Sequence, residues 1–144
     1  MTSSVRRIAA RICVDLGLAD QELSILLTND AEIRRLNFAY RGKDHPTDVL
    51  SFSQIEGESM PAAKAQLGDV VISLETASRQ ARERRQTLKA ELQQLLVHGI
   101  LHLLGHNHVN GGQASRAMRL TEQHLLKLLA RKTSGRRQHR KGEK

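Results

Sequence analysis

The leucine-rich stretch at residues 88–104, LKAELQQLLVHGILHLL, constrains the fold more than any other part of the chain. Its apolar residues cover more than one face of a helix, which is typical of a helix buried on most sides. Thr87 is suited to cap its first turn, and Gly105 is suited to end it in a left-handed turn. The sequence therefore predicts a central buried helix on which the other elements pack.

Other segments alternate between helical and strand patterns. Apolar spacing predicts helices at about 5–16, 30–38, 75–85 and 114–129, and β-branched runs predict strands at about 23–28, 48–52 and 67–74. Asn29 and Glu32 resemble a capping box, Gly17 is suited to end the first helix, and Gly42 and Pro46 predict a loop. We expect an α+β fold, in which a small mixed β-sheet packs with about five helices.

Positive charge is concentrated at the C-terminal end. Residues 131–144, RKTSGRRQHRKGEK, contain seven Lys or Arg and one Glu, so this segment carries most of the formal net charge of +8. We predict a single catalytic domain over residues 1–130 and a basic, disordered tail over residues 131–144. Such a tail is either a solvated end or a flexible arm with nonspecific affinity for phosphate.

Several residue types are scarce, and each scarcity has a consequence. The 144 residues include no Trp, one Tyr and two Phe, so we expect an aliphatic core and no aromatic platform for stacking bases. The single Cys13 excludes an internal disulfide and favours a reducing cytoplasm. No apolar stretch reaches the roughly 18 residues that span a bilayer, and the N-terminus lacks a secretion signal. We therefore predict a cytoplasmic protein with no membrane partner.

Three histidines at the end of the buried helix have the spacing of metal ligands. His98 and His102 are four residues apart, so their rings share one face of the helix. If Gly105 turns the chain back, His108 reaches the same ion. Three nitrogen ligands leave a fourth position open, as in catalytic zinc sites where bound water has a pKa near about 7. We predict one Zn²⁺ ion held by His98, His102 and His108.

The same spacing also separates this site from a peptidase. Long-motif zinc proteases have the pattern H-E-x-x-H-x-x-G-x-x-H, in which Glu is the general base. Here Gly99 occupies the Glu position, which disfavours proteolysis. An isolated pair of histidines four residues apart is more often an ordinary surface or core pair than a metal site. Three imidazole rings beside a run of leucines favour coordination of a metal ion. We expect His106 to be a loop side chain rather than a ligand.

The motif "HGILHLLGHNH" at 98–108 resembles the signature H-G-x-L-H-L-x-G-[YF]-D-H of the YbeY family of bacterial endoribonucleases. Two further stretches resemble the same family in the same order, "YRGKDHPTDVLSF" at 40–52 and "LGDVVIS" at 67–73. The resemblance covers roughly residues 20–130. Three separated motifs in the expected order make it more specific than the histidine spacing alone.

This resemblance implies a metal-dependent, single-strand-specific endoribonuclease that processes ribosomal RNA at the 3′ end of the small-subunit RNA. It also implies a role in ribosome quality control, with the small ribosomal subunit and its assembly factors as partners. His98, His102 and His108 match the family's zinc ligands, and Arg41 matches its motif arginine, which implies catalytic contact with the RNA phosphate. From the residues alone, Arg41 is more simply a solvated loop arginine.

The chain departs from the family pattern in several places. His106 and Asn107 replace the usual Tyr-Asp, so the acidic side chain is lost, and "VNGGQASRAM" replaces the usual acidic residues after the third histidine. Only Met118 and Glu122 match the pattern there. Because the chain begins almost inside its first helix, we expect either a missing edge strand or a shortened N-terminus.

Two aspartates belong to the motifs of the second and third stretches. We expect Asp48 and Asp69 to be structural, although either is suited to orient a histidine ligand.

Two alternative functions stay open. One is a non-nucleolytic ribosome-assembly factor or RNA chaperone with a structural zinc. The other is a metal-dependent hydrolase of a different substrate. The favoured function is the zinc-dependent endoribonuclease.

Overall fold

The computed structural model describes residues 2–54, 66–105 and 113–142. In chain order the elements are α1 (Thr2–Asp15), β1 (Glu22–Thr28), α2 (Asp30–Arg41), β2 (Val49–Ser53), β3 (Gln66–Ser73), α3 (Leu74–Glu83), α4 (Leu88–Gly105) and α5 (Gln113–Gly142). Five helices and a small sheet within these ranges confirm the predicted α+β fold.

The sheet has strand order β1-β3-β2, so β3 is central and the other two strands lie at its edges. Strand β1 pairs with β3 in parallel, whereas β2 pairs with β3 in antiparallel, which confirms that the sheet is mixed. Parallel pairing requires a long crossover, and here α2 and β2 lie between β1 and β3 in the chain.

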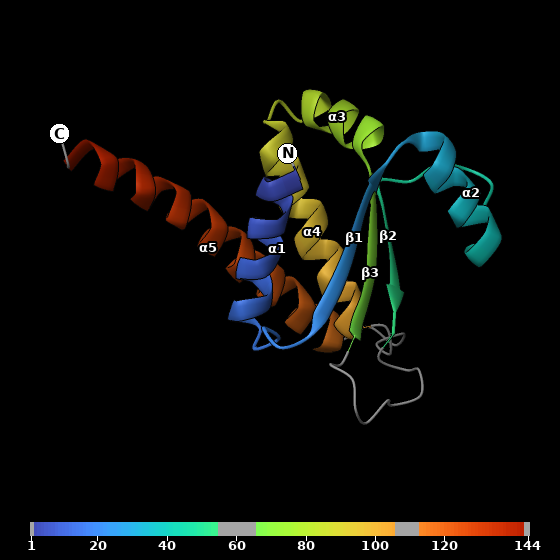
Figure 1. The fold of residues 1–144 in the computed structure, drawn as a ribbon, viewed down its shortest axis with the longest axis horizontal. Coiled ribbons are helices and arrows are strands. Elements are labelled where there is room, and N and C mark those ends of the chain that lie inside the picture. The colour runs from blue at the N-terminus through green and yellow to red at the C-terminus, as the bar shows by residue number, and fades with distance from the viewer. Residues whose placement is uncertain (1, 55–65, 106–112, 143–144) are drawn as a thin grey trace.

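The helices cover the two faces of the sheet unequally. Helices α1, α4 and α5 lie on one side and α2 lies on the other, with α3 at one end (Figure 1). Helix α4 is in the middle of the larger layer, where Leu96, Ile100 and Leu103 are completely buried. The smaller cluster on the α2 side is formed by Ile33, Leu50 and Val71. The central position of the leucine-rich helix is therefore confirmed.

The ends of the first two helices follow their local sequence. The side chain of Asn29 accepts a hydrogen bond of 2.8 Å from the Glu32 N–H, as the capping box predicts. Gly17 has a φ of 75°, the left-handed conformation in which Gly commonly ends a helix. Helix α2 continues past Phe38, where its end was expected, and stops at Gly42 with a φ of 72°.

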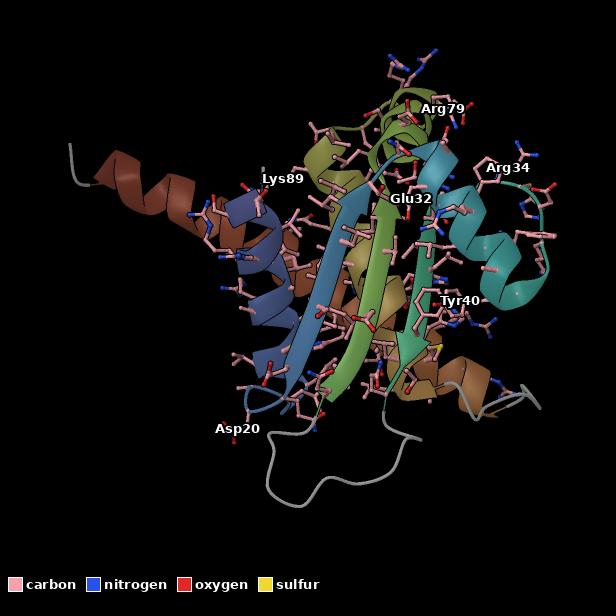
Figure 2. All side chains as sticks on the ribbon, turned by 45° about the vertical axis from the view of Figure 1, so that its right-hand side comes forward. Asp20, Glu32, Arg34, Tyr40, Arg79 and Lys89 are labelled. Carbon is pink, nitrogen blue, oxygen red and sulfur yellow. The ribbon has the colours of Figure 1, made fainter. Side chains whose placement is uncertain are left out.

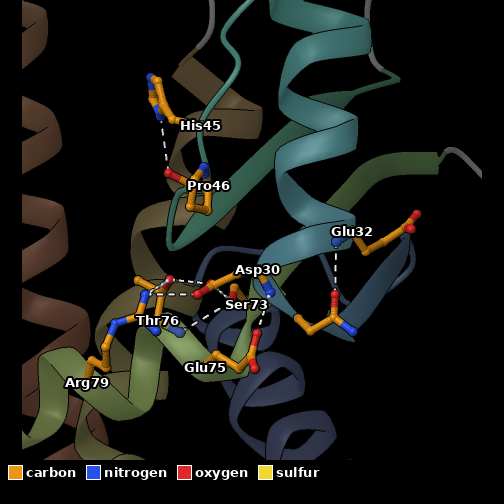
Figure 3. Close-up of polar contacts among 9 residues, drawn as sticks. Asp30, Glu32, His45, Pro46, Ser73, Glu75, Thr76 and Arg79 are labelled. Carbon is orange, nitrogen blue, oxygen red and sulfur yellow. Dashed lines mark hydrogen bonds and ion pairs between the residues drawn. The ribbon is translucent and has the colours of Figure 1, made fainter.

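One polar cluster joins α2 to α3 (Figure 3). The Asp30 Oδ1 accepts hydrogen bonds of 2.6 Å from the hydroxyls of Ser73 and Thr76. Arg79 lies 2.9 Å from the other carboxylate oxygen. Reciprocally, the Asp30 N–H donates to Glu75 Oε1 at 2.8 Å. These bonds anchor the start of α2 and therefore the direction in which that helix crosses the sheet.

Helix α5 includes residues 131–142, which the sequence predicts to be a tail outside the catalytic domain. The division of the chain at residue 130 stays a prediction. None of the helices among the described residues is long and apolar enough to cross a membrane.

Candidate metal and RNA-cleavage site

A pocket of about 320 Å³ lies between the end of α2, strand β2 and helix α4. It brings together two of the predicted metal ligands and the predicted catalytic arginine, which come from distant parts of the chain. The lining residues are Arg41, Val49, Ser51, Ser53, His98, His102 and Leu103.

The two histidines of the pocket are adjacent on the surface of α4. The centroids of the His98 and His102 rings lie 4.3 Å apart, with an angle of 56° between the ring planes. This proximity follows from the helical repeat, which places residues four apart above one another. Two imidazoles so close on one rigid helix form the kind of donor pair that a transition metal ion binds.

Gly99 allows this part of α4 to approach the sheet. A Cβ atom at this position would lie 2.9 Å from Val70 Cγ1 and 3.3 Å from Ser51 Oγ. The Ser51 hydroxyl donates a hydrogen bond of 2.9 Å to the Gly99 carbonyl, which ties β2 to α4 beside the histidines. The sequence indicates only that Gly99 removes the peptidase base, whereas the structure shows that there is no room for a larger side chain.

Arg41 belongs to the last turn of α2 and not to the predicted loop. The helix ends directly after it, because Gly42 adopts the left-handed conformation with a φ of 72°. The buried Asn37 donates a hydrogen bond of 2.9 Å to the His45 carbonyl, which attaches the following segment to the helix. Arg41 is therefore held at a defined position at the edge of the pocket, on a helix and not on a free loop.

The electrostatic surroundings favour the neutral form of His102. Burial lowers the pKa of His102, and the adjacent His98 acts in the same direction. Arg41 lowers this pKa further, whereas Glu122 on α5 opposes the shift. A neutral imidazole is the form that binds a metal ion. Glu122 also lies near the other ring, with its Oε2 3.9 Å from His98 Nδ1.

The third predicted ligand, His108, lies outside the described residues, as do His106 and Asn107. Within residues 2–54, 66–105 and 113–142, no group of three His, Cys, Asp or Glu side chains is arranged to hold a metal ion. The donors that the structure describes are thus the first two of the predicted three.

The two aspartates of the motifs do not line this pocket. Asp69 lies on the α2 side of β3, where it accepts a hydrogen bond of 3.3 Å from Gln54 Nε2. The Asp48 carbonyl accepts a bond of 3.0 Å from the Ser73 N–H, which aligns the start of β2 with the end of β3. Because this Asp48 contact is made by the backbone, the structural role of its side chain stays a prediction, whereas Asp69 lies in a second groove.

Sequence reasoning missed Ser51 and did not place Glu122 at this site. Ser51 is part of a strand motif with no polar signature, and only its register places its hydroxyl against α4. Glu122 matches the family pattern in sequence, but its proximity to His98 depends on how α5 packs on α4. A sequence pattern gives neither the distance from Ser51 to Gly99 nor the distance from Glu122 to His98.

Comparison with known proteins decides the family. The family model described as endoribonuclease YbeY matches residues 1–130. The chain belongs to the YbeY family. Among its curated relatives, the endoribonuclease YbeY of Aquifex aeolicus is 51% identical over 116 residues, covering 81% of this chain and 75% of the relative. That of Geobacter metallireducens is 44% identical over 131 residues, covering 90% and 87%.

A solved structure supports the same assignment. The solution structure of TM1509 from Thermotoga maritima has a TM-score of 0.61 and 28% sequence identity, and the match covers 86% of this chain and 77% of that one. Membership of the YbeY family confirms the family predicted from the three motifs. It also confirms the predicted enzyme class, because the curated relatives are named as endoribonucleases.

Proposed function

We propose that this protein is a zinc-dependent, single-strand-specific endoribonuclease that matures the 3′ end of small-subunit ribosomal RNA in the cytoplasm. The observation that carries this proposal is the shared pocket of His98, His102 and Arg41. A pair of metal donors next to a guanidinium is suited to cleavage of a phosphodiester. The reaction needs a metal ion at the scissile bond and a positive group that offsets the negative charge of the phosphate. Small-subunit assembly factors are the partners proposed with this role.

The donor set fits a metal ion. His98 and His102 would bind it from α4, and His108 would supply the third nitrogen. When bound, the ion supplies Lewis acidity toward the phosphate and lowers the pKa of a coordinated water. Three histidine ligands with an open position favour zinc among the common divalent ions. Glu122 is positioned to orient the His98 ring, as acidic partners of histidine ligands commonly do.

Arg41 supplies the phosphate contact in this proposal. Its guanidinium is always charged and can donate two parallel hydrogen bonds to phosphate oxygens. Those bonds would hold the scissile phosphate beside the histidines and stabilise the negative charge that develops on its oxygens. Because the end of α2 is fixed by Gly42 and Asn37, the Arg41 backbone holds a defined position beside the pocket, from which the side chain can reach a phosphate.

The packing at Gly99 argues against a peptidase. The Cβ of a Glu at this position would lie 2.9 Å from Val70 Cγ1 and 3.3 Å from Ser51 Oγ, so the general base of the long-motif zinc proteases requires a shift of the helix or the strand here. Hydrolysis of peptides is thus less well supported than cleavage of RNA.

The test compares RNA cleavage and metal content in the zinc-loaded full-length protein and its variants. We expect the wild type to cleave a single-stranded RNA containing the 3′-end region of small-subunit rRNA and to leave the same RNA intact in a duplex. His102→Ala should lose both the metal and cleavage. Arg41→Ala should keep the metal and lose about 100-fold in kcat/KM, a typical loss for one transition-state donor.

Lys43→Ala is the matched control for Arg41→Ala. Lys43 is exposed, lies two residues after Arg41 in the chain and does not line the pocket. Its replacement removes the same charge, so cleavage should be unchanged. Full cleavage by both His102→Ala and Arg41→Ala would refute the proposed site. Full zinc content without RNA cleavage in the wild type would favour the assembly-factor alternative.

A further inference from the structure

A second groove lies on the other side of strand β2 from the histidine pocket. It has a volume of about 370 Å³, which is at the lower end of the range of ligand pockets, about 300 to 1,000 Å³. It lies between α2 and the exposed part of the sheet. Its lining includes Leu26, Leu36, Tyr40, Phe52, Gln54 and Asp69.

Two of the three aromatic residues in the chain meet in this groove. The Tyr40 and Phe52 rings have centroids 5.2 Å apart and planes inclined by 60°, an edge-to-face contact. Tyr40 nevertheless remains 70% exposed, and it lies beside β2 where α2 ends (Figure 2). Every nucleobase has a π-face that stacks on such a ring. The scarcity of aromatic residues predicts no platform for stacking bases, but the fold brings two of these side chains together in one groove.

The polar lining of the groove suits a base better than a phosphate. Asp69 contributes a carboxylate, and the described lining residues include no Lys or Arg. Gln54 Nε2 binds one of the carboxylate oxygens at 3.3 Å. A carboxylate has about four lone-pair sites, so Asp69 can also accept from a ligand N–H. Acidic side chains pair with the exocyclic amino groups of bases such as cytosine.

The groove adjoins the proposed cleavage site across strand β2. Arg41 lines the histidine pocket and its chain neighbour Tyr40 lines the groove. Consecutive Cα atoms are about 3.8 Å apart, so the two sites start from neighbouring backbone positions and lie within the span of a short RNA segment. Strand β2 divides the two sites in the same way, because Ser51 and Ser53 line the pocket and Phe52 lines the groove.

We propose that this groove binds one nucleobase next to the scissile phosphate and favours a base with an exocyclic amino group. Tyr40 stacks on the base and Asp69 accepts a hydrogen bond from its amino group. The RNA strand crosses the end of β2, with its phosphate at Arg41 on one side and the base on the other. This inference rests on the proposed function for the position of the cleaved bond, but base binding can be measured without cleavage.

The test is a scan of abasic sites along a short single-stranded RNA. Affinity and kcat/KM are measured for the zinc-loaded full-length wild type, with one base removed at a time. Removing the base that occupies the groove should weaken binding roughly tenfold, as expected for the loss of one stacked base. In Tyr40→Ala the intact RNA should bind about tenfold more weakly, and the same abasic site should cause no further loss. Tyr40→Phe should behave as the wild type.

Phe38→Ala is the matched control, because Phe38 is also an exposed aromatic residue of α2 but does not line the groove. It should leave the scan unchanged. Replacing cytosine by uracil at the sensitive position should cost roughly tenfold in the wild type, a typical discrimination for one base-edge contact. In Asp69→Ala this difference should disappear.

The outcomes separate this inference from the proposed function. If the wild type cleaves RNA but no abasic position is sensitive to Tyr40→Ala, the base site is refuted and the endoribonuclease stands. If RNA binds with the predicted abasic sensitivity but is not cleaved, the base site stands and the proposed reaction fails. If Tyr40→Ala changes neither RNA binding nor cleavage, the inference is overturned, and a protein partner becomes the better occupant of the groove.

Discussion

The Ser51 hydroxyl donates a hydrogen bond of 2.9 Å to the backbone carbonyl of Gly99, and this bond joins the edge strand of the sheet to the helix that carries the histidines. Such contact is possible because Gly99 has no side chain. The helix surface at Gly99 lies directly on Val49, Ser51 and Val70. The positions of His98 and His102 relative to β2 therefore depend on a glycine between them.

Gly99→Ala should destabilise the protein, although Ala is the better helix former. The new Cβ would lie 2.9 Å from Val70 Cγ1, and overpacking of this kind costs about 1 to 3 kcal/mol. The gain in helix propensity offsets at most about 1 kcal/mol. We expect a lower free energy of unfolding in urea. An equal or higher value would show that α4 can move away from the sheet without cost. Ala90→Gly, at a half-buried site in the first turn of the same helix, should cost little more than the helix propensity.

Glu122→Gln should weaken zinc binding while leaving the fold intact. The Glu122 Oε2 lies 3.9 Å from His98 Nδ1, and loss of a carboxylate beside a histidine ligand costs about 10- to 100-fold in metal affinity. Because the carboxylate is not within direct hydrogen-bonding distance, we expect a loss near tenfold in a competitive chelator titration. Gln123→Ala, an exposed neighbour on α5, serves as the control. Equal affinities for all three proteins would contradict a role for Glu122.

Asp30 should make stability depend on pH in the acidic range. Hydrogen bonds from Ser73 and Thr76 lower the pKa of Asp30, and Arg79 acts in the same direction against the effect of burial. A lowered folded-state pKa gives stability that is fully present above the unfolded value, about 3.9, and is lost as pH falls through the folded value. Asp30→Asn should therefore be less stable than wild type at pH 7, by about 1 to 2 kcal/mol.

The two proteins should begin to converge in stability below about pH 4, where the carboxyl of the unfolded chain becomes protonated, and the charge effect is lost once the pH is below the lowered folded-state pKa. Urea unfolding at pH 7, 5, 4 and 3 measures this difference. A constant difference at every pH would mean that the variant acts through packing and not through the charge of Asp30.

The basic C-terminal segment should increase the salt dependence of RNA binding. For single strands, each neutralised phosphate adds about 0.7 to the slope of log affinity against log salt. Substitution of four residues by Gln should lower that slope by as much as about 3 if all four contact phosphate; these residues are Arg136, Arg137, Arg140 and Lys141. Fluorescence anisotropy with a short RNA at several salt concentrations measures it. An unchanged slope would identify the segment as a solvated end.

Several local features of the fold could be predicted because their causes are local. Asn29 caps a helix through an amide three residues away, and Gly17 adopts a backbone conformation that other residues avoid. The end of α2 was predicted three residues early, because the apolar pattern fades at Phe38 although the backbone continues to Gly42. For that reason Arg41 was expected in a loop.

The sequence by itself determined the α+β class, the family and the helical spacing of His98 and His102, since each depends on residues close together in the chain or on motifs in order. Only the tertiary structure decided which distant groups meet: Arg41 with the histidine pair, and Tyr40 with Phe52 beside Asp69. The physical reason is register and packing. One strand, β2, presents Ser51 to α4 and Phe52 to α2, and a shift of one residue would exchange them.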